Sequence, residues 1–370
     1  MIDMTATFVL RNVKTTDGNA ADIVVENGKI AGIVPPGTGD GQNVMDFKNK
    51  VYVSSGWIDM HVHAFPEFDP YGDDIDEIGY KLGVTTIIDA GSTGADRIHD
   101  LVSNSKKAKT NVFAFLNISR IGLKKIDELS DLSLLNEEKL IKAVTENKDF
   151  IVGLKARISK SVVGPNGVEP LKIARRFSKD TDLPLMVHIG SGPPDINDVL
   201  DLLEENDVIT HFLNGKANNL FDASGKPLPK LLKAMERGVR LDVGHGNASF
   251  SFRVAEHAKE HGIRFDTIST DIYRKNRLHG PVYSMANVLT KFLHLGYSLK
   301  EIMDAVTVNP AKWLRKPALG RISVGDIANL TLFSIENEPT VLSDSEGEER
   351  RADQKIVVKG VVMNGEYIEC

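Results

Sequence analysis

Short apolar segments rich in β-branched residues recur along the central part of the chain, each followed by a loop and a stretch of helical periodicity. Continuous apolar runs are typical of strands covered on both faces, as in a parallel sheet. Repeats of strand and helix predict the α/β class and a closed (β/α)8 TIM barrel across residues 57–317. An open doubly wound sheet is the alternative, but the first strand lacks a GxGxxG turn. The eight predicted strands span 57–63, 84–91, 111–118, 150–156, 183–190, 208–213, 239–246 and 267–273.

Both ends of the chain show shorter runs of alternating apolar and polar positions, and Asp17-Gly18 and Asn27-Gly28 separate the first of them. Such dipeptides favour tight hairpin turns because glycine accepts positive φ. We therefore predict that residues 1–56 and 318–370 pair into one small β-sandwich domain formed by both termini. The charged stretch 344–351 is expected to be a solvated loop of this domain.

The composition excludes several classes of protein. Lysine and arginine total 45 against 51 acidic residues, and the net charge of −6 offers no basic footprint for nucleic acid. The single cysteine, Cys370, cannot form an intramolecular disulfide, so a metal site would use nitrogen and oxygen ligands. The start of the chain does not resemble a signal peptide, and no apolar run has the length of a membrane span. We expect a cytoplasmic protein without membrane or nucleic-acid partners.

Residues that can bind metal ions occupy the ends of the predicted strands. His61 and His63 end the first strand, and the period of two places both imidazoles on the same face. In a barrel, catalytic groups come from the carboxyl ends of the strands. A histidine near one strand end is usually a satisfied core residue, but six such side chains at one mouth favour a metal-dependent hydrolase. The other four are Lys155, His188, His211 and Asp271.

Lys155 requires a separate explanation because it follows an apolar strand, where an unpaired ammonium group is costly. One interpretation is an ion pair with Asp271 or another carboxylate. The other is capture of carbon dioxide as a carbamate, since a protonated lysine has no lone pair for a metal. A carbamate would offer two anionic oxygens that can bridge two metal ions.

These motifs resemble the amidohydrolase superfamily, of the binuclear type with a carboxylated lysine. The resemblance covers essentially the whole chain. Within the superfamily, the sequence is most similar to a deacetylase branch whose members are often labelled dihydroorotase or adenine deaminase. The matching segments are 57–63, 84–91, 153–155, 186–194, 210–216, 242–246, 269–271, 307–311, 320–322, 324–326 and 328–330.

The resemblance implies roles for the six residues. His61, His63 and Asp271 would hold the more buried of two divalent ions, expected to be zinc, and His188 and His211 the more exposed one. Carboxylated Lys155 and a hydroxide would bridge the two ions. Asp271 would be the catalytic residue that takes the proton as the hydroxide attacks.

The same branch implies a deacetylase-like hydrolase that cleaves an amide or ester bond of a small acylated amino acid or hydroxy acid. The substrate is expected to bear a carboxylate, and arginines can clamp such a group through two hydrogen bonds. His279 could also reach the mouth, whereas His257 and His261 are expected on the surface. The predicted substrate-binding residues are Arg157, Asn214, His245, Tyr273 and Arg274.

Three other functions remain open at this stage. A dihydroorotase would carry an arginine two residues after His63, where this chain has Phe65. An adenine deaminase is expected to have a mononuclear site that lacks a lysine at the position of Lys155. A non-catalytic scaffold typically loses ligands, and none of the six is missing. The native metal, the acyl group, its stereochemistry and a homo-oligomeric state are not determined by the sequence.

Overall fold

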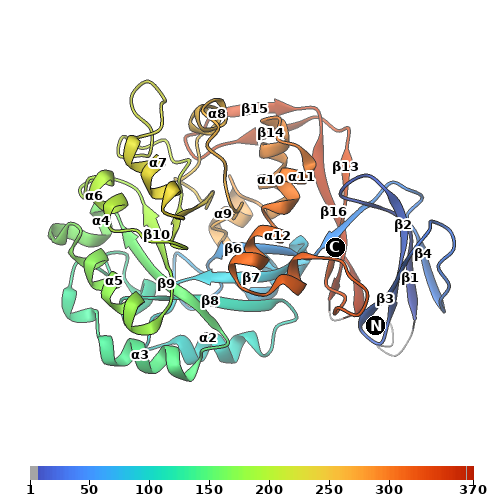
Figure 1. The fold of residues 1–370 in the computed structure, drawn as a ribbon, viewed down its shortest axis with the longest axis horizontal. Helices are drawn as coiled ribbons and strands as arrows, with labels where there is room; N and C mark the ends of the chain where they lie inside the picture. The colour runs from blue at the N-terminus through green and yellow to red at the C-terminus, as the bar shows by residue number, and fades with distance from the viewer. Residues whose placement is uncertain (1–6, 364) are drawn as a thin grey trace.

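The computed structural model describes residues 7–363 and 365–370. A parallel barrel surrounded by helices forms the larger part of the molecule, and a sheet built from both ends of the chain lies beside it (Figure 1). The predicted α/β barrel is therefore confirmed.

The strands of the barrel pair in parallel and follow one another in sequence order, which is the arrangement expected for repeated strand and helix units. Parallel pairing brings the carboxyl end of each strand to the same mouth, so side chains distant in sequence meet there. Seven strands are assigned within the described residues: β6 (Trp57–Val62), β7 (Val84–Ala90), β8 (Asn111–Asn117), β9 (Ile151–Ile158), β10 (Leu185–Ile189), β11 (Val208–Thr210) and β12 (Arg240–Asp242).

The helices bury an apolar stripe against the barrel. In α5, Leu171, Ala174 and Phe177 recur at helical spacing and are buried, and its neighbours follow the same pattern. The helices are α1 (Ile75–Ile78), α2 (Ile98–Ser105), α3 (Glu137–Glu146), α4 (Lys160–Val163), α5 (Glu169–Thr181), α6 (Ile196–Asp201), α7 (Pro229–Glu236), α8 (Phe252–Glu260), α9 (Arg274–His279), α10 (Met285–His294), α11 (Leu299–Asp304) and α12 (Val308–Trp313).

The eighth predicted strand, 267–273, closes the barrel without forming a regular ladder. It makes isolated parallel bridges to β12 through Thr267 and to β6 through Ile272. Backbone hydrogen bonds from Asp271 to His61 (2.7 Å) and from His63 to Ile272 (3.0 Å) complete the contact with β6. The ladder is interrupted because Asp271 has a left-handed backbone, with φ 52°.

Two strands are shorter than the sequence predicts. β11 ends at Thr210 because His211 has φ 71°, and β12 ends at Asp242 shortly before Gly244, with φ 49°. At both positions the chain leaves the extended conformation and turns inward toward the mouth.

Two buried carboxylates tie the closing segment to its neighbours. Asp59 of β6 accepts hydrogen bonds from the hydroxyl (2.5 Å) and the backbone N–H (3.1 Å) of Thr270. Asp242 of β12 accepts from the hydroxyls of Thr267 and Ser269, both at 2.6 Å. These side-chain bonds replace part of the missing ladder.

The terminal sheet joins the two ends of the chain. Within residues 7–363 and 365–370, its order is β17-β16-β13-β5-β1-β2-β3, with β4 also paired to β1. The antiparallel pair β5–β13 connects the amino-terminal strands to the carboxyl-terminal ones. The domain division at residues 56 and 318 stays a prediction. The strands are β1 (Phe8–Thr15), β2 (Ala20–Glu26), β3 (Lys29–Val34), β4 (Asn43–Asp46), β5 (Tyr52–Ser55), β13 (Leu330–Glu336), β16 (Lys355–Met363) and β17 (Glu366–Glu369).

The stretch 344–351 is mostly exposed, as its charge predicts, but it is not an irregular loop of the terminal domain. It forms the turn and second strand of a separate hairpin, β14 (Thr340–Ser343) and β15 (Glu349–Ala352), which lies against the barrel near α8 and α10 (Figure 1). Asp344 is buried and accepts a hydrogen bond from the backbone of Phe252 (3.0 Å). Its carboxylate is therefore used internally, which composition alone does not reveal.

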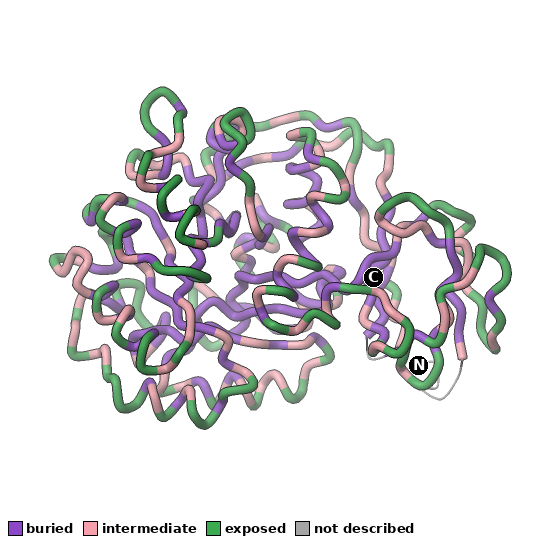
Figure 2. The backbone as a smooth tube through the Cα atoms, viewed as in Figure 1, coloured by how far each residue is buried: buried purple, intermediate pink, exposed green. Residues whose placement is uncertain are grey.

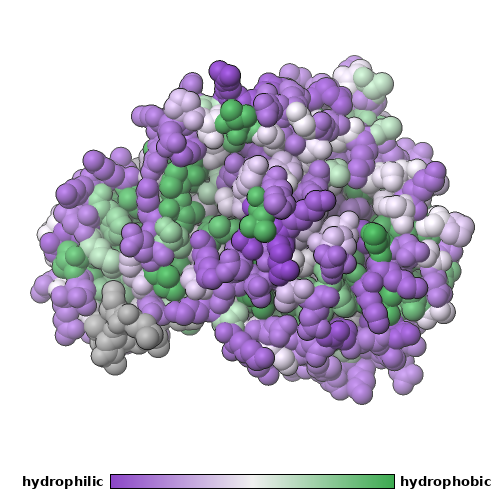
Figure 3. All heavy atoms as spheres, turned by 180° about the vertical axis from the view of Figure 1, so that it is seen from behind, coloured by the Kyte–Doolittle hydropathy of each residue, from purple (hydrophilic) through white to green (hydrophobic). Residues whose placement is uncertain are grey.

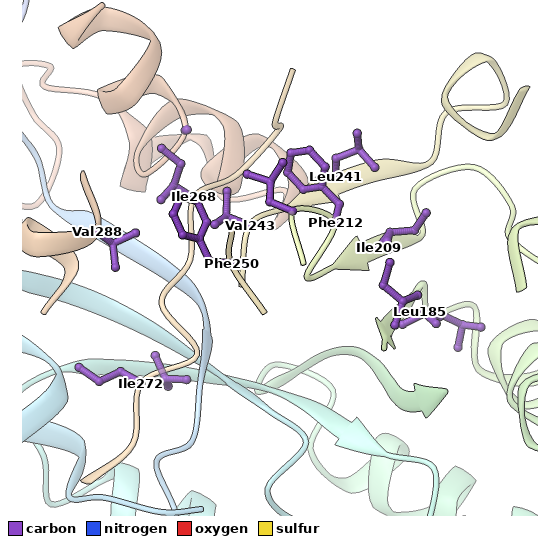
Figure 4. Close-up of a cluster of buried hydrophobic side chains, with 14 of the residues drawn as sticks. Leu185, Ile209, Phe212, Leu241, Val243, Phe250, Ile268, Ile272 and Val288 are labelled. Carbon is purple, nitrogen blue, oxygen red and sulfur yellow. The ribbon is translucent and has the colours of Figure 1, made fainter. Parts of the chain in front are cut away.

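The main apolar core lies between the barrel and its helices, and the buried backbone in Figure 2 follows this interior. Figure 4 shows part of this core, where Leu185, Ile209 and Leu241 come from consecutive strands. Ile268 and Ile272 of the closing segment belong to the same core. Packing thus holds this segment in place together with the two carboxylates.

The face seen from behind is largely hydrophilic, with separate apolar areas (Figure 3). Across the described part of the chain, no helix combines the length and the apolar character that a bilayer crossing requires.

Replacing Thr270 tests how the barrel closes. Thr270→Val removes the hydroxyl that donates to buried Asp59 and accepts from Ile272, whereas Thr270→Ser keeps it. We expect Thr270→Val to lower the free energy of unfolding by about 2 kcal/mol, because an unpaired buried polar group costs about 1–3 kcal/mol. Thr270→Ser should lose less than half of that in equilibrium urea unfolding. A loss in Thr270→Ser that equals or exceeds the loss in Thr270→Val would contradict a closure stabilised mainly by the hydroxyl.

Candidate metal centre

A cavity of about 180 Å³ opens at the carboxyl ends of the barrel strands, and all six predicted metal ligands line it. Their presence in one cavity confirms the common mouth expected from the strand ends. A larger hollow of about 640 Å³ lies at the amino ends of the strands, around Ile151, Pro184 and Val208. It contains none of the predicted site residues, so the smaller cavity is the candidate site.

Hydrogen bonds fix the ring of His61. The hydroxyl of Thr210 donates to Asp242 (2.7 Å) and therefore accepts from Nδ1–H of His61 (2.9 Å). This assignment leaves Nε2 of His61 unprotonated, with its lone pair toward the cavity. A carboxylate behind a histidine ligand is the usual way in which proteins orient a metal-binding imidazole.

His63 and His211 are held in the same manner. Nδ1 of His63 lies 2.9 Å from the hydroxyl of Ser92, and Nδ1 of His211 donates to the carbonyl of Gly244 (2.5 Å). The ring of His188 packs edge-on against that of His211, with centroids 4.5 Å apart.

Burial makes these histidines weak bases. It lowers the pKa of His61 and His188 well below the usual value and that of His211 to about 3. At neutral pH all three rings are therefore uncharged, which is the state that binds metal ions.

Asp271 lies at the centre of the cluster. Its Oδ1 is 3.1 Å from Nε2 of His63 and 3.4 Å from Nε2 of His61. Burial alone would raise its pKa, but the hydrogen bond with His63 and the nearby charges leave it below the usual value. Gly246 permits this position, because a Cβ there would lie 2.3 Å from Oδ2 of Asp271. The carboxylate is ionised and faces the cavity.

Lys155 is buried, with Nζ 3.2 Å from Nε2 of His61 and 3.3 Å from Sδ of Met186. Within the described residues, no carboxylate lies within 4.0 Å of Nζ, so the alternative of an ion pair with Asp271 is wrong. Burial lowers the pKa of Lys155 to about 7. Gly91 accommodates the side chain, since a Cβ there would lie 2.6 Å from Cβ of Lys155.

Two of the predicted substrate-binding residues line the cavity. Arg157 does so, but its Nη1 also pairs with buried Glu128 at 3.0 Å. Tyr273 caps α9 beside the ring of His63, and burial raises its pKa, so the hydroxyl keeps its proton.

Three others are placed elsewhere. The ring of His245 turns away from the mouth into the core. There it stacks on Phe250 and accepts a hydrogen bond from buried Lys291 (2.8 Å). Asn214 is fully buried and bonds to backbone atoms of its own loop. Arg274 is half exposed and faces Asp73. None of these three side chains lines the cavity.

The remaining histidines also lie outside the cavity. His279 is exposed at the end of α9, and His257 and His261 belong to α8 and its carboxyl-terminal cap. The expectation that His279 reaches the mouth is therefore wrong, whereas the two α8 histidines are peripheral as predicted.

Sequence reasoning missed several residues that shape the site. Asp242 and Thr210 orient His61, and Ser92 contacts His63. Lys216 also lines the cavity, six residues after the end of β11, and its sequence position does not distinguish it from its neighbours in this loop. Asp242 begins the matching segment 242–246, and this was the available signal.

The donor set fits divalent metal ions. His61, His211 and Asp271 offer ligand atoms that lie within 4.8 Å of one another. In both imidazoles the proton is on Nδ1, away from the cavity, which leaves Nε2 free to bind a metal ion. Two such nitrogen ligands together with a carboxylate match the preference of zinc and related ions. A Lewis-acid site for hydrolysis is what this arrangement can provide.

The chain belongs to the amidohydrolase family, whose model matches residues 52–367. It is a hydrolytic enzyme that acts on carbon–nitrogen bonds of small molecules, in a family that generally uses divalent metals.

The similar proteins carry different names. A deacetylase of Enterococcus faecalis is 41% identical over 364 residues, which cover 98% of this chain and 99% of the relative. The crystal structure of an adenine deaminase is 41% identical with a TM-score of 0.94, and that of a dihydroorotase is 32% identical with a TM-score of 0.90. Each covers 98% of this chain and 99% of its own. The names agree on hydrolysis and differ on the substrate.

Proposed function

We propose that this protein is a metal-dependent deacylase that removes an acetyl or similar group from a small amino acid or hydroxy acid. The observation that carries the proposal is the convergence of six side chains at one barrel mouth, with the Nδ1 atoms of three histidines held from behind. The relatives named deacetylase support the choice of reaction.

Two divalent ions, with zinc as the proposed metal, suit this set of ligands. His61, His63 and Asp271 would hold one ion, and His188 and His211 the other, with carboxylated Lys155 shared between them. Such ions, when bound, lower the pKa of water and polarise a carbonyl group.

Lys155 is suited to carboxylation because its pKa of about 7 leaves much of the amine neutral at physiological pH. The nitrogen lone pair attacks carbon dioxide, a C–N bond forms, and one amine proton leaves to solvent. The product is an anion in a pocket that has no carboxylate within ion-pair distance of Nζ among the residues described.

Asp271 is the proposed catalytic acid and base. Its carboxylate is ionised, partly exposed to the cavity and held by His63, so it can accept the proton of the attacking water. The same oxygen then delivers that proton to the leaving amine or alkoxide. Tyr273 and Arg157 line the path and are proposed to hydrogen-bond the substrate.

The structure also bears on the competing reactions. Phe65 occupies the position where a dihydroorotase-like site would need an arginine, and it is buried in the core against Phe68. Lys155 disfavours a simple mononuclear deaminase site. Ring opening and deamination are therefore the alternative outcomes of the test. We also propose that the protein is cytoplasmic.

Product release across a substrate panel tests the function. Zinc-reconstituted protein should release acetate from one stereochemical series of acetylated amino acids or hydroxy acids, measured with paired D and L compounds. Dihydroorotate and adenine belong in the same panel. Ammonia from adenine, or ring opening alone, would replace the deacylase proposal with one of the two alternatives.

Asp271→Asn keeps the size of the side chain but removes the proton acceptor. We expect kcat to fall by about 10²–10⁴-fold, the usual contribution of general acid–base catalysis, with the metal content reduced far less. Steady-state kinetics and elemental analysis on the same samples check both parts. Near-normal turnover with metal present would exclude Asp271 from proton transfer.

Lys155→Ala should lose bound metal and activity together, because the shared ligand is removed. A short carboxylic acid such as acetate or propionate in the buffer should restore part of both if a carbamate normally fills this place. Lys155→Arg is the matched control, since it keeps a cation and cannot form the carbamate, and the added acid should not restore it. Full metal content in Lys155→Ala without added acid would contradict the proposed role.

A further inference from the structure

We infer that Lys216 is the residue that selects substrates bearing a carboxylate, through a direct ion pair at the mouth of the barrel. This inference rests on the proposed function and deepens it by naming the determinant of substrate class. It also corrects the expectation that an arginine does this work.

Lys216 is a cation of the cavity whose ammonium group has neither an acidic nor a hydrogen-bonding partner among the described residues. Its side chain is partly buried and lines the cavity, yet no acidic oxygen of the described residues lies within 4.0 Å of Nζ and no hydrogen bond to Nζ is formed. Burial lowers the pKa of Lys216 by more than the charge of the more distant Asp271 raises it. An anionic ligand would provide that compensation.

The arginines differ from Lys216 in this respect. Arg157 forms an ion pair with Glu128, which is fully buried, and its Nη1 also donates to the carbonyl of Ile126. Arg274 faces Asp73 outside the cavity. Lys216 therefore offers a substrate carboxylate a positive charge that no acidic side chain within 4.0 Å already neutralises among the described residues.

Hydrogen bonds and a close contact with the C-terminal hairpin hold the loop that carries Lys216. The side chain of Asn214 donates to the carbonyl of His211 (2.8 Å) and accepts from the backbone N–H of Lys216 (3.1 Å). At Gly215, a Cβ would lie 2.2 Å from Glu346 of the C-terminal hairpin, so the hairpin presses against this loop. Asn214 thus positions Lys216 relative to a proposed metal ligand instead of contacting substrate.

The ammonium group lies next to the proposed chemistry. Nζ of Lys216 and Nε2 of His188 are 3.4 and 3.5 Å from the point that a Cβ on Gly190 would occupy. The two groups therefore border the same small volume. A carboxylate close to the scissile bond, as in α-amino and α-hydroxy acids, can reach Lys216 while the acyl group lies among the histidines.

The test compares two substrates that differ only in the carboxylate, the best acetylated acid of the panel and its carboxamide. In Lys216→Met holoenzyme, kcat/KM for the acid should fall by about 10- to 100-fold, mainly through KM, while that for the carboxamide stays within about twofold. Lys216→Arg should recover part of the loss. Lys226→Met, an exposed lysine of the same loop, is the matched control and should behave as wild type.

A second measurement keeps this inference separate from the proposed function. Calorimetric titration of the holoenzyme with D- and L-lactate measures carboxylate binding without any turnover, and Lys216→Met should weaken it by a similar factor. If no acylated compound is hydrolysed, the deacylase proposal fails but the titration still decides the role of Lys216. An unchanged preference for the acid in Lys216→Met, or equal lactate binding in both proteins, would overturn the inference.

Discussion

The closure of the barrel at residues 267–273 is the constraint on which the rest of the site depends. A regular ladder cannot run through this segment because Asp271 has a left-handed backbone that directs its carboxylate into the mouth. Buried carboxylates on β6 and β12 compensate by binding the hydroxyls of Thr267, Ser269 and Thr270. Asp242 also fixes the ring of His61 through Thr210, so closure and ligand orientation share one hydrogen-bond network.

Burial sets the chemistry of this network. It removes the charge from the histidines and lowers the pKa of Lys155 to about 7, so the imidazoles and much of the lysine amine offer lone pairs at neutral pH. Assembling such groups without compensation is unfavourable, and bound cations would relieve it. The strained backbone at His211 and Asp271 fits the same picture, because strain of this kind tends to concentrate at functional sites.

The C-terminal hairpin extends the support of the mouth beyond the barrel. Lys291 of α10 donates to the carbonyls of Pro281 and Ser343 and to His245, which links the hairpin to the loop after β12. Ser345 donates to the carbonyl of Gly246, the glycine that packs against Asp271. The predicted substrate contact at His245 is thus a structural junction between two segments far apart in sequence.

The sequence by itself determined the barrel, its strand order and the six side chains at the mouth, because strand periodicity and parallel pairing fix which residues end at one edge. Only the tertiary structure decided which loop residues face the cavity. His245, Asn214 and Arg274 follow strand ends as regularly as Lys216 does, yet a left-handed turn at His211 and the contact of Gly215 with Glu346 bring Lys216 inward. Side-chain direction in loops depends on such local backbone turns and distant contacts, which leave no periodic signal in the sequence.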